Sequence, residues 1–518
     1  MGDEAAGKPP VVILREETNV TSGTAVQEKL IVAARVFADI LRPTYGPRGL
    51  DKMLYKTDGN TAITNDGAKI VAELMVKHPA AKMFVAMAES QENACGDGVT
   101  GTLLLSAELL IEANRLLQKG LHPLTIVDGY IRANEIAQDM ITSLEIPASK
   151  ELLLDVATTS LTGKGAEGAS EKISEMVVEA LAIVDGETEN ISMHKTNTGS
   201  LESSKLLLGV AVRRRIILDA LPNIIEDARV ATINGDIAPR KQIRSSEIEI
   251  EDVNKLEAFL DAEDTIRDDL ADKLIKSGAN VFICSGVVDK GILHRLLRAG
   301  HFVAGEFDDS ELRNTALATG SRIIEHLADI SESDVGVAGR LVSEKKPSTD
   351  QVEDIIRLEQ CPSPKVVTCE IGGANSMAAE EAIRAIHDSL RATSLAMKSN
   401  RLIHGGGATH MSCALAIREA AEHASGRERL AMEAYSRALE IIPSTLAQNA
   451  GADALDKILE LRAAHRNRSN DVGITATGEV ASTGAMEASD CLRSALNSAT
   501  ETCSSMLRID QVVSARGD

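Results

Sequence analysis

The two ends of this chain have helical sequence patterns, whereas its middle alternates between strand-like and helix-like segments. Apolar residues recur at helical spacing over Thr24–Leu41, through residues 68–142 and again through residues 405–507. Residues 214–363 alternate instead. A chain of 518 residues is long enough for about three domains. The simplest arrangement is a middle domain inserted into a helical domain that both chain ends build.

The middle of the chain has the pattern of a parallel α/β sheet. We expect a buried strand at residues 279–284, a helix around residues 293–297 and a second strand at residues 301–304. A strand, a helix and a strand in succession are typical of neighbouring parallel strands. Another strand is expected at residues 366–371. Residues 240–272 are strongly charged and poor in apolar side chains. This segment is either a solvated loop and helix or a part that projects from the domain.

Composition narrows the classes of function. The net charge of −22 argues against nucleic acid as the main partner, because a protein that binds phosphate backbones needs a basic face. The seven cysteines include no Cys-x-x-Cys pair, so buried thiols in a reducing compartment are favoured over a metal cluster or a disulfide framework. The sequence has neither a signal-peptide pattern nor an apolar run long enough to span a membrane. We therefore expect a cytoplasmic protein.

Two aspartates, Asp66 and Asp97, stand in glycine-containing turns about thirty residues apart. Asp97 lies between two glycines, directly before an apolar helical pattern. Glycines let backbone N–H groups approach an anion, and the following helix adds its positive N-terminal end. A carboxylate repels phosphate, but it can bind a magnesium ion that bridges to phosphate. The pattern therefore indicates a nucleotide-phosphate site with a metal. A tight turn that caps an ordinary helix is the alternative.

Ten short motifs, taken in order along the chain, resemble the group II chaperonins, which are the thermosome and its eukaryotic cytosolic relatives. They lie at residues 46–54, 64–68, 78–82, 96–100, 159–167, 277–281, 384–390, 405–408, 439–443 and 507–510. Each motif alone is weak, but their shared order makes coincidence implausible. The resemblance extends over about residues 12–513. The Gly-Lys-Gly-Ala-Glu run at residues 163–167 is most similar to archaeal thermosome subunits.

The resemblance implies a multidomain α and α/β subunit with three tiers. Residues 1–145 and 401–518 would form a helical equatorial ATPase domain, residues 146–213 and 364–400 an α/β intermediate hinge domain, and residues 214–363 an α/β apical domain that binds unfolded protein. Residues 240–272 would form a helical protrusion that closes the chamber. The resemblance also implies two stacked rings of identical or related subunits, with neither nucleic acid nor membrane as a partner.

The same resemblance implies roles for individual residues, with ATP and Mg²⁺ as cofactors. Asp97 would bind Mg²⁺, while Asp66 and Asp388 would position the attacking water. Lys164 would sense the terminal phosphate, and Glu487 would lie near the ribose or base. The residues implied to contact the nucleotide are Gly46, Pro47, Gly98, Val99, Thr100, Gly101, Gly163, Lys164, Gly406, Gly407 and Glu487. These roles suit phosphoryl transfer to water, which needs a metal, a cation and a carboxylate that orients water.

Departures from the family pattern keep a second hypothesis open. Val99 and Gly101 stand where the family usually has hydroxyl side chains, and the connection between residues 480 and 484 is shorter than usual. The leading hypothesis is an ATP-driven folding machine. The alternative is a ring subunit that binds client protein or partner subunits with little hydrolysis. A small-molecule kinase is a third class, but the sequence lacks the Gly-x-x-x-x-Gly-Lys-Ser/Thr motif of its commonest form.

Overall fold

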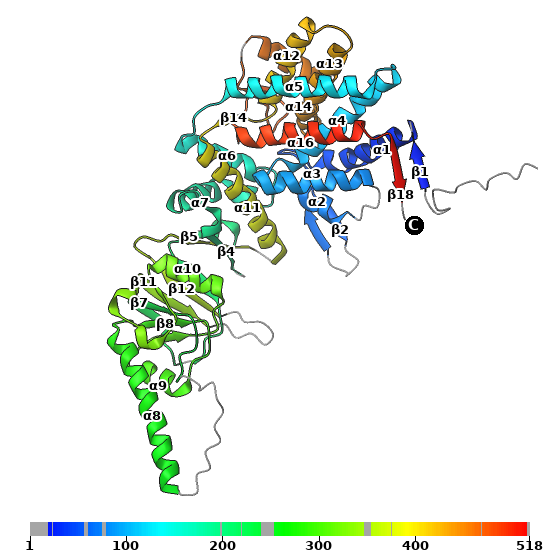
Figure 1. Cartoon of the computed structure of the whole chain (residues 1–518). Coiled ribbons are helices and arrows are strands. Elements are labelled where there is room, and N and C mark those ends of the chain that lie inside the picture. The colour runs from blue at the N-terminus through cyan, green and yellow to red at the C-terminus, as the bar shows by residue number, and fades with distance from the viewer. Residues whose placement is uncertain are drawn as a thin grey trace, which may run out of the picture. The chain divides into compact units, whose positions relative to one another are not determined.

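The computed structural model of the chain describes residues 19–22, 24–55, 61–74, 79–196, 199–218, 220–239, 253–345, 354–373, 376–467 and 469–514. The chain divides into two compact units, one made of Met1–Glu167 and Arg391–Asp518 and the other of Gly168–Leu390. Both chain ends therefore build one unit, and the middle segment forms the second. Figure 1 labels the elements of both. The finer division into equatorial, intermediate and apical domains stays a prediction.

The unit built by the chain ends, called here unit 1, is mainly helical. Its helices are α1 (Thr24–Leu41), α2 (Gly67–Glu73), α3 (Pro79–Cys95), α4 (Val99–Gln118), α5 (Pro123–Leu144), α6 (Lys150–Leu161), the end of α11 (Ser376–Ser399), α12 (Ala408–His423), α13 (Glu428–Leu439), α14 (Ile441–Asn449), α15 (Ala454–Arg466) and α16 (Ser489–Leu507). Helix α1 has the predicted bounds. Pro123 is the first residue of α5 and follows Gly120, as the sequence predicts, because proline is tolerated where no intrahelical N–H bond is needed.

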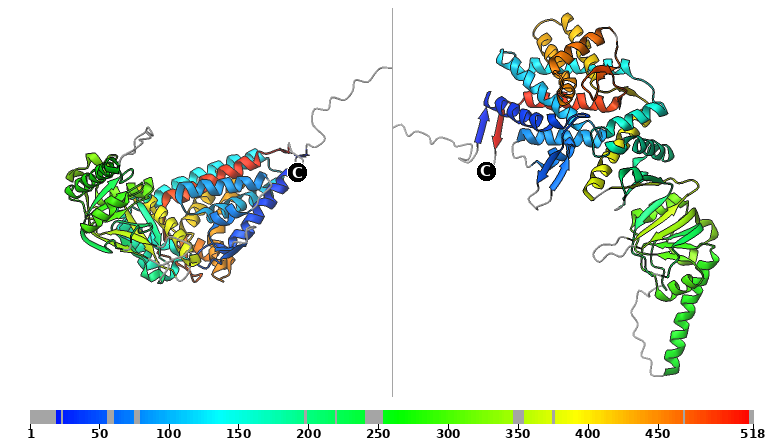
Figure 2. Two further views of the ribbon diagram at one scale, coloured as in Figure 1. Left: turned by 90° about the horizontal axis from the view of Figure 1, so that it is seen from below. Right: turned by 180° about the vertical axis from the view of Figure 1, so that it is seen from behind.

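Short antiparallel strand pairs complete unit 1. They are β1 (Asn19–Ser22) with β18 (Gln511–Ser514), β2 (Lys52–Tyr55) with β3 (Thr61–Thr64), β14 (Leu402–His404) with β17 (Met486–Ala488), and β15 (Val472–Ile474) with β16 (Val480–Ser482). Figure 2 shows β1 and β18 side by side. Their register places Asn19 opposite Ser514. The Asp58-Gly59-Asn60 sequence between two short strand-like runs predicts a hairpin. The pairing of β2 with β3 confirms its strands, while its turn lies outside the described residues.

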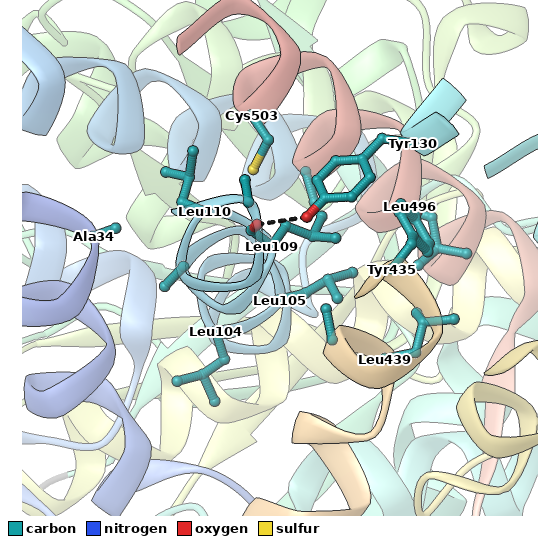
Figure 3. Close-up of a cluster of buried hydrophobic side chains, with 14 of the residues drawn as sticks. Ala34, Leu104, Leu105, Leu109, Leu110, Tyr130, Tyr435, Leu439, Leu496 and Cys503 are labelled. Atoms are coloured by element: carbon teal, nitrogen blue, oxygen red, sulfur yellow. Dashed lines mark hydrogen bonds between the residues drawn. The ribbon is translucent and has the colours of Figure 1, made fainter. Parts of the chain in front are cut away.

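Helix α4 lies at the centre of the unit 1 core. Helices α1, α3, α5, α13 and α16 all pack against it. Its leucines Leu104, Leu105 and Leu109 are at most 1% exposed, as expected for a helix with neighbours on several sides. Figure 3 shows these leucines and the hydroxyl of Tyr130, which donates to the Leu109 carbonyl at 2.8 Å. The core is therefore mostly aliphatic, as the low aromatic content predicts, and both chain ends contribute to it.

The middle segment, unit 2, is built on two sheets. The larger has the strand order β6 (Val210–Arg213), β12 (Ile355–Glu359), β11 (Gly336–Glu344), β7 (Ile224–Ile233), β8 (Val281–Cys284), β9 (Phe302–Ala304), with β10 (Ile323–Ile324) also paired to β7. The smaller has the order β4 (Ile191–Lys195), β13 (Val367–Ile371), β5 (Lys205–Leu207). The helices of this unit are α7 (Ser170–Ile183), α8 (Val253–Lys276), α9 (Lys290–Arg298), α10 (Asp309–Thr319) and the first part of α11.

The predicted strand–helix–strand succession is confirmed. Strands β8 and β9 are parallel neighbours, with Val281 opposite Phe302, and α9 connects them. The strand predicted at residues 366–371 is β13, which is buried along its whole length. Unit 2 therefore has the mixed α/β character that the sequence indicates, and the fold class of a multidomain α and α/β chain is confirmed.

The charged segment at residues 240–272 differs in part from what its composition predicts. Residues 240–252 lie outside the described ones, and the rest belongs to α8, whose first turns extend away from the sheet (Figures 1 and 2). Because this segment is charged and has few apolar residues, the sequence predicts that it adds little to the domain core. Its C-terminal end nevertheless packs, because Ala271 is completely buried and Leu274, just beyond the segment, is buried too. The helix continues to Lys276, so its last turns pack, while residues 261–266 are largely exposed.

All seven cysteines are free thiols, and all but Cys491 are buried, in agreement with their predicted role as small apolar residues. None of the helices in the described ranges is both long and apolar enough to cross a lipid bilayer.

Candidate nucleotide site

The carboxylate of Asp97 lies directly before α4. Its Oδ1 accepts a hydrogen bond from the Gly98 N–H at 2.8 Å, and its Oδ2 accepts one from the Ser160 hydroxyl at 3.1 Å. The Nζ of Lys164 lies 3.8 Å from Oδ1. Gly98 is the N-cap of α4 and has a left-handed backbone with φ of 81°, which glycine adopts without strain. The structure thus brings together the predicted metal ligand, the start of the phosphate loop and the predicted phosphate sensor.

The second acidic turn lies beside the first. Asp66 is the N-cap of α2 and accepts a hydrogen bond from Ala68 N at 2.9 Å. Gly67, the next residue, packs against the side chain of Thr100 in the first turn of α4. The Asn65 side-chain amide donates to the carbonyl of Gly163, which precedes Lys164. The two turns that the sequence singles out therefore belong to one site.

A third carboxylate, Glu92 on α3, lies near these two aspartates. Burial raises its pKa above the ordinary value, and the negative charges of Asp66 and Asp97 raise it further. Arg391 Nη1 lies 3.2 Å from Glu92 Oε1 and offsets part of this effect. Sequence reasoning gives Glu92 no role, because nothing around it resembles a binding motif.

Close backbone contact joins the loop before β2 to the turn after α6. A β-carbon on Gly163, which has φ of 77°, would lie 2.8 Å from the carbonyl oxygen of Gly46 and 3.2 Å from the Cα of Pro47. A residue with a side chain therefore cannot replace Gly163 without moving the 46–47 loop. This contact puts three predicted nucleotide residues side by side.

One face of α14 forms a common wall for three of the predicted glycines. Gly101 in α4 lies against Ile442, Gly407 at the start of α12 lies against Pro443, and Gly46 lies against Leu446. Residues 439–443 form one of the family motifs, but their sequence gives no sign that this helix lines a site. The apolar spacing of α14 is that of any buried helix.

The acid of Glu487 belongs to the strand β17, which pairs with β14 so that Glu487 is opposite Ile403. Its Oε1 would lie 2.8 Å from a β-carbon on Gly405, the residue before the predicted Gly406. Burial raises the pKa of Glu487 to about 7, and the charge of Asp97 contributes to this rise. Glu487 is therefore close enough to Asp97 to respond to its charge, and it gains or loses a proton near neutral pH.

These residues fit a nucleotide with a metal ion. Helices α4 and α12 begin at the left-handed N-cap glycines Gly98 and Gly407, which have no side chain to satisfy the first backbone N–H groups. Such N–H groups bind phosphate oxygens. Within the described ranges no three His, Cys, Asp or Glu side chains cluster as a metal site. A metal at Asp97 would need phosphate and water as its other ligands, which is the coordination that Mg²⁺ prefers.

Two other predicted residues need separate comment. Val99 is 4% exposed and belongs to the unit 1 core, so its side chain packs and only its backbone can serve a phosphate. Asp388 is on the part of α11 that belongs to unit 2, whereas all the residues above belong to unit 1. Its predicted role in positioning water therefore stays a prediction.

A model of the TCP-1/cpn60 chaperonin family matches residues 37–517. The chain belongs to this family, which confirms the resemblance drawn from its motifs. Its relatives include the thermosome subunit beta of Archaeoglobus fulgidus, at 37% identity over 98% of this chain and 95% of the relative. The thermosome subunit of Methanocaldococcus jannaschii is also 37% identical, with the same coverage. The thermosome subunit alpha of Methanothermobacter thermautotrophicus is 36% identical over 99% of this chain and 95% of the relative.

Proposed function

We propose that this chain is a chaperonin subunit in which ATP binding and hydrolysis drive the closure of a double-ring chamber around unfolded protein. The observation that carries the proposal is the arrangement around Asp97. A carboxylate held at the start of a long helix, with Lys164 Nζ 3.8 Å away and Asp66 in the adjacent turn, offers the groups that phosphoryl transfer to water requires.

Each group has a separate task in this proposal. The N–H groups at the start of α4 bind phosphate oxygens, and Asp97 holds the metal, with Ser160 and Gly98 fixing its carboxylate. Mg²⁺, when bound, neutralises charge on the phosphates. Lys164 exchanges its contact with Asp97 for the terminal phosphate. Asp66, together with Asp388 from the other unit, orients the water that attacks it.

The assembly that we propose follows the family. Identical or related subunits form two stacked rings, and the names alpha and beta of the relatives support rings of related subunits. Residues 1–145 and 401–518 serve as the ATPase domain, residues 146–213 and 364–400 as the hinge, and residues 214–363 as the domain that binds unfolded protein. We also propose a cytoplasmic location.

Steady-state phosphate release by the purified chain tests the ATPase. We expect release that depends on Mg²⁺ and falls strongly in Asp388→Ala, while negative-stain images show rings for both proteins. Rings without phosphate release would favour the alternative, a ring subunit that binds client protein or partner subunits with little hydrolysis. The loss of hydroxyl groups at Val99 and Gly101 is the observation that favours that alternative. If the purified chain forms no rings and releases no phosphate, both hypotheses are contradicted.

A further inference from the structure

Gly101 is an unusual residue for its position. It is the third residue of α4, where glycine costs about 0.5–1 kcal/mol relative to alanine because of its greater freedom in the unfolded chain. Its backbone is ordinary for a helix, since Gly101 is not among the residues with positive φ. The conformation of the backbone therefore does not require glycine at this position.

The side chain of Tyr45 occupies the space next to Gly101. A β-carbon on residue 101 would lie 3.4 Å from the Tyr45 hydroxyl and 3.6 Å from its Cε2. A β-carbon alone would therefore make ordinary contact, but a larger side chain would collide with the ring. The phenol hydroxyl thus stands where a hydroxyl side chain on residue 101 would reach. The two positions are coupled, because a small residue at 101 leaves room for a large residue at 45.

Tyr45 is held firmly in this place. The Asn449 side-chain amide donates to the carbonyls of both Tyr45, at 2.7 Å, and Arg42, at 2.8 Å. The backbone of Tyr45 is extended, and the chain turns at the left-handed Gly46 that follows it. The ring is partly buried and contacts the core of unit 1. A residue whose backbone is anchored and whose ring is packed in this way loses little entropy when it binds a ligand.

The hydroxyl of Tyr45 is a hydrogen-bond donor without a partner. Among the residues that the structure describes, none accepts a hydrogen bond from it, whereas the backbone carbonyl of Tyr45 accepts one from the Asn449 side chain. Burial raises its pKa well above the ordinary value, and the negative charges of Glu487 and Asp97 raise it further. The hydroxyl therefore keeps its proton at neutral pH. It lies near the predicted metal ligand and beside the first turn of α4.

We propose that the Tyr45 hydroxyl donates a hydrogen bond to a nucleotide phosphate oxygen and so replaces the hydroxyl side chain that Gly101 lacks. This rests on the proposed nucleotide site. Tyr45 is then a binding residue, and the phosphate contact moves from the helix to the loop before Gly46 without being lost. A hydrogen bond donated to a charged oxygen contributes more binding free energy than a hydrogen bond donated to a neutral acceptor. Removal of the Tyr45 hydroxyl should therefore have a measurable effect on affinity.

The competing explanation is that the ring of Tyr45 merely fills the space beside a glycine. The two explanations differ in what the oxygen atom does. Tyr45→Phe keeps the ring and removes only the hydroxyl, so a packing role predicts no change in affinity. Tyr55→Phe is a matched control, because Tyr55 is 80% exposed on β2.

The test is calorimetric titration of the full-length protein with MgATP, MgADP and magnesium tripolyphosphate. We expect Tyr45→Phe to weaken the binding of all three ligands by about tenfold without changing the thermal midpoint. We expect Tyr55→Phe to bind them like the wild type. Unchanged binding by Tyr45→Phe would overturn the proposal. So would weaker binding of the nucleotides alone, because the contact would then be to the base or ribose. If the wild type binds none of the three ligands, the proposed function fails as well, so the two failures are distinguishable.

A double substitution tests the coupling between the two positions. Tyr45→Leu should weaken MgATP binding, and Gly101→Thr added to it should restore a large part of the affinity, because it returns a hydroxyl to the helix. Gly101→Thr alone should collide with the ring and lower the thermal midpoint. If the double variant binds MgATP no better than Tyr45→Leu does, the proposal that the Tyr45 hydroxyl replaces a hydroxyl at position 101 is overturned.

Discussion

The Nζ of Lys164 lies 3.8 Å from Oδ1 of Asp97, and both side chains are partly buried, with 19% and 35% of their surfaces exposed. The carboxylate does not depend on the lysine for its orientation, because Gly98 N and the Ser160 hydroxyl each hold one of its oxygens. The lysine can therefore move toward a phosphate while the carboxylate stays in place to bind a metal. Substitutions of Lys164 and of Asp97 should therefore change nucleotide binding in different ways.

Lys164→Ala should weaken MgATP binding about tenfold while changing MgADP binding less than twofold. The reason is that a cation that contacts the terminal phosphate has no partner in the diphosphate. Titration calorimetry with both nucleotides measures the difference, and Lys119→Ala, at an exposed position, is the control. Equal weakening of both nucleotides would show that Lys164 contacts the inner phosphates instead.

Asp97→Ala should abolish the part of nucleotide affinity that depends on magnesium. Only a bridging cation reconciles a carboxylate with a phosphate group at the start of α4. Affinity measured with excess chelator should be similar in both proteins, and this serves as the internal control. MgATP binding that is as tight in the variant as in the wild type would remove Asp97 from the metal site.

Local sequence signals predict the individual turns and helix ends of the nucleotide site better than the contacts that bring them together. The turn at Asp97 and the end of α1 depend on glycine and proline within a few residues, so the sequence reveals them. The wall formed by α14 depends on the contact of Gly46 with Leu446, four hundred residues later. Such contacts come from tertiary packing, which the periodicity of the sequence does not reveal. Ser160 lies within the motif at residues 159–167, but the sequence does not indicate its hydrogen bond to Asp97, since a serine within a helix resembles many others.

Asp388→Ala should preserve nucleotide affinity and slow turnover by about a hundredfold or more. A carboxylate that acts only on the attacking water contributes to the transition state and not to binding. Single-turnover hydrolysis and equilibrium titration, measured on the same preparation, separate the two effects. The neighbouring exposed His387 provides the control variant His387→Ala. A turnover rate equal to that of the wild type would exclude Asp388 from the reaction.

Glu487→Gln should stabilise the protein above neutral pH and have little effect near pH 5. The folded protein raises the pKa of Glu487 from 4.5 to about 7, so it binds this proton more tightly than the unfolded chain does. The wild type therefore loses stability as the pH rises from about 4.5 to 7, by up to about 3 kcal/mol. The variant has no such loss. Thermal midpoints at pH 5 and pH 8 measure this, with the exposed Glu479→Gln as control. An equal difference at both pH values would contradict the shifted pKa.

The charged segment that ends in α8 should tolerate a short deletion but not a long one. Of residues 240–266, those whose side chains are described, 261–266, are largely exposed, so unit 2 should remain folded without this stretch and ATP turnover should stay largely intact. Removing residues 240–272 also deletes the buried Ala271 and both acidic partners of Arg295, Asp268 and Asp272. That loss should cost about 2–4 kcal/mol. Urea unfolding of the two deletions compares them, and equal stability would contradict the packing role.

The proposed role of this segment in closing the chamber makes a further prediction for the wild type. Protease cleavage within residues 240–266 should be fast without nucleotide and at least tenfold slower with a mimic of the ATP hydrolysis transition state, because ordered segments resist cleavage. The short deletion should hydrolyse ATP yet fail to protect a bound unfolded protein from the same protease. Asp388→Ala with ATP provides a control in which the nucleotide is bound but not hydrolysed. If cleavage is equally fast with and without the mimic, the segment is a surface helix and loop with no part in closure.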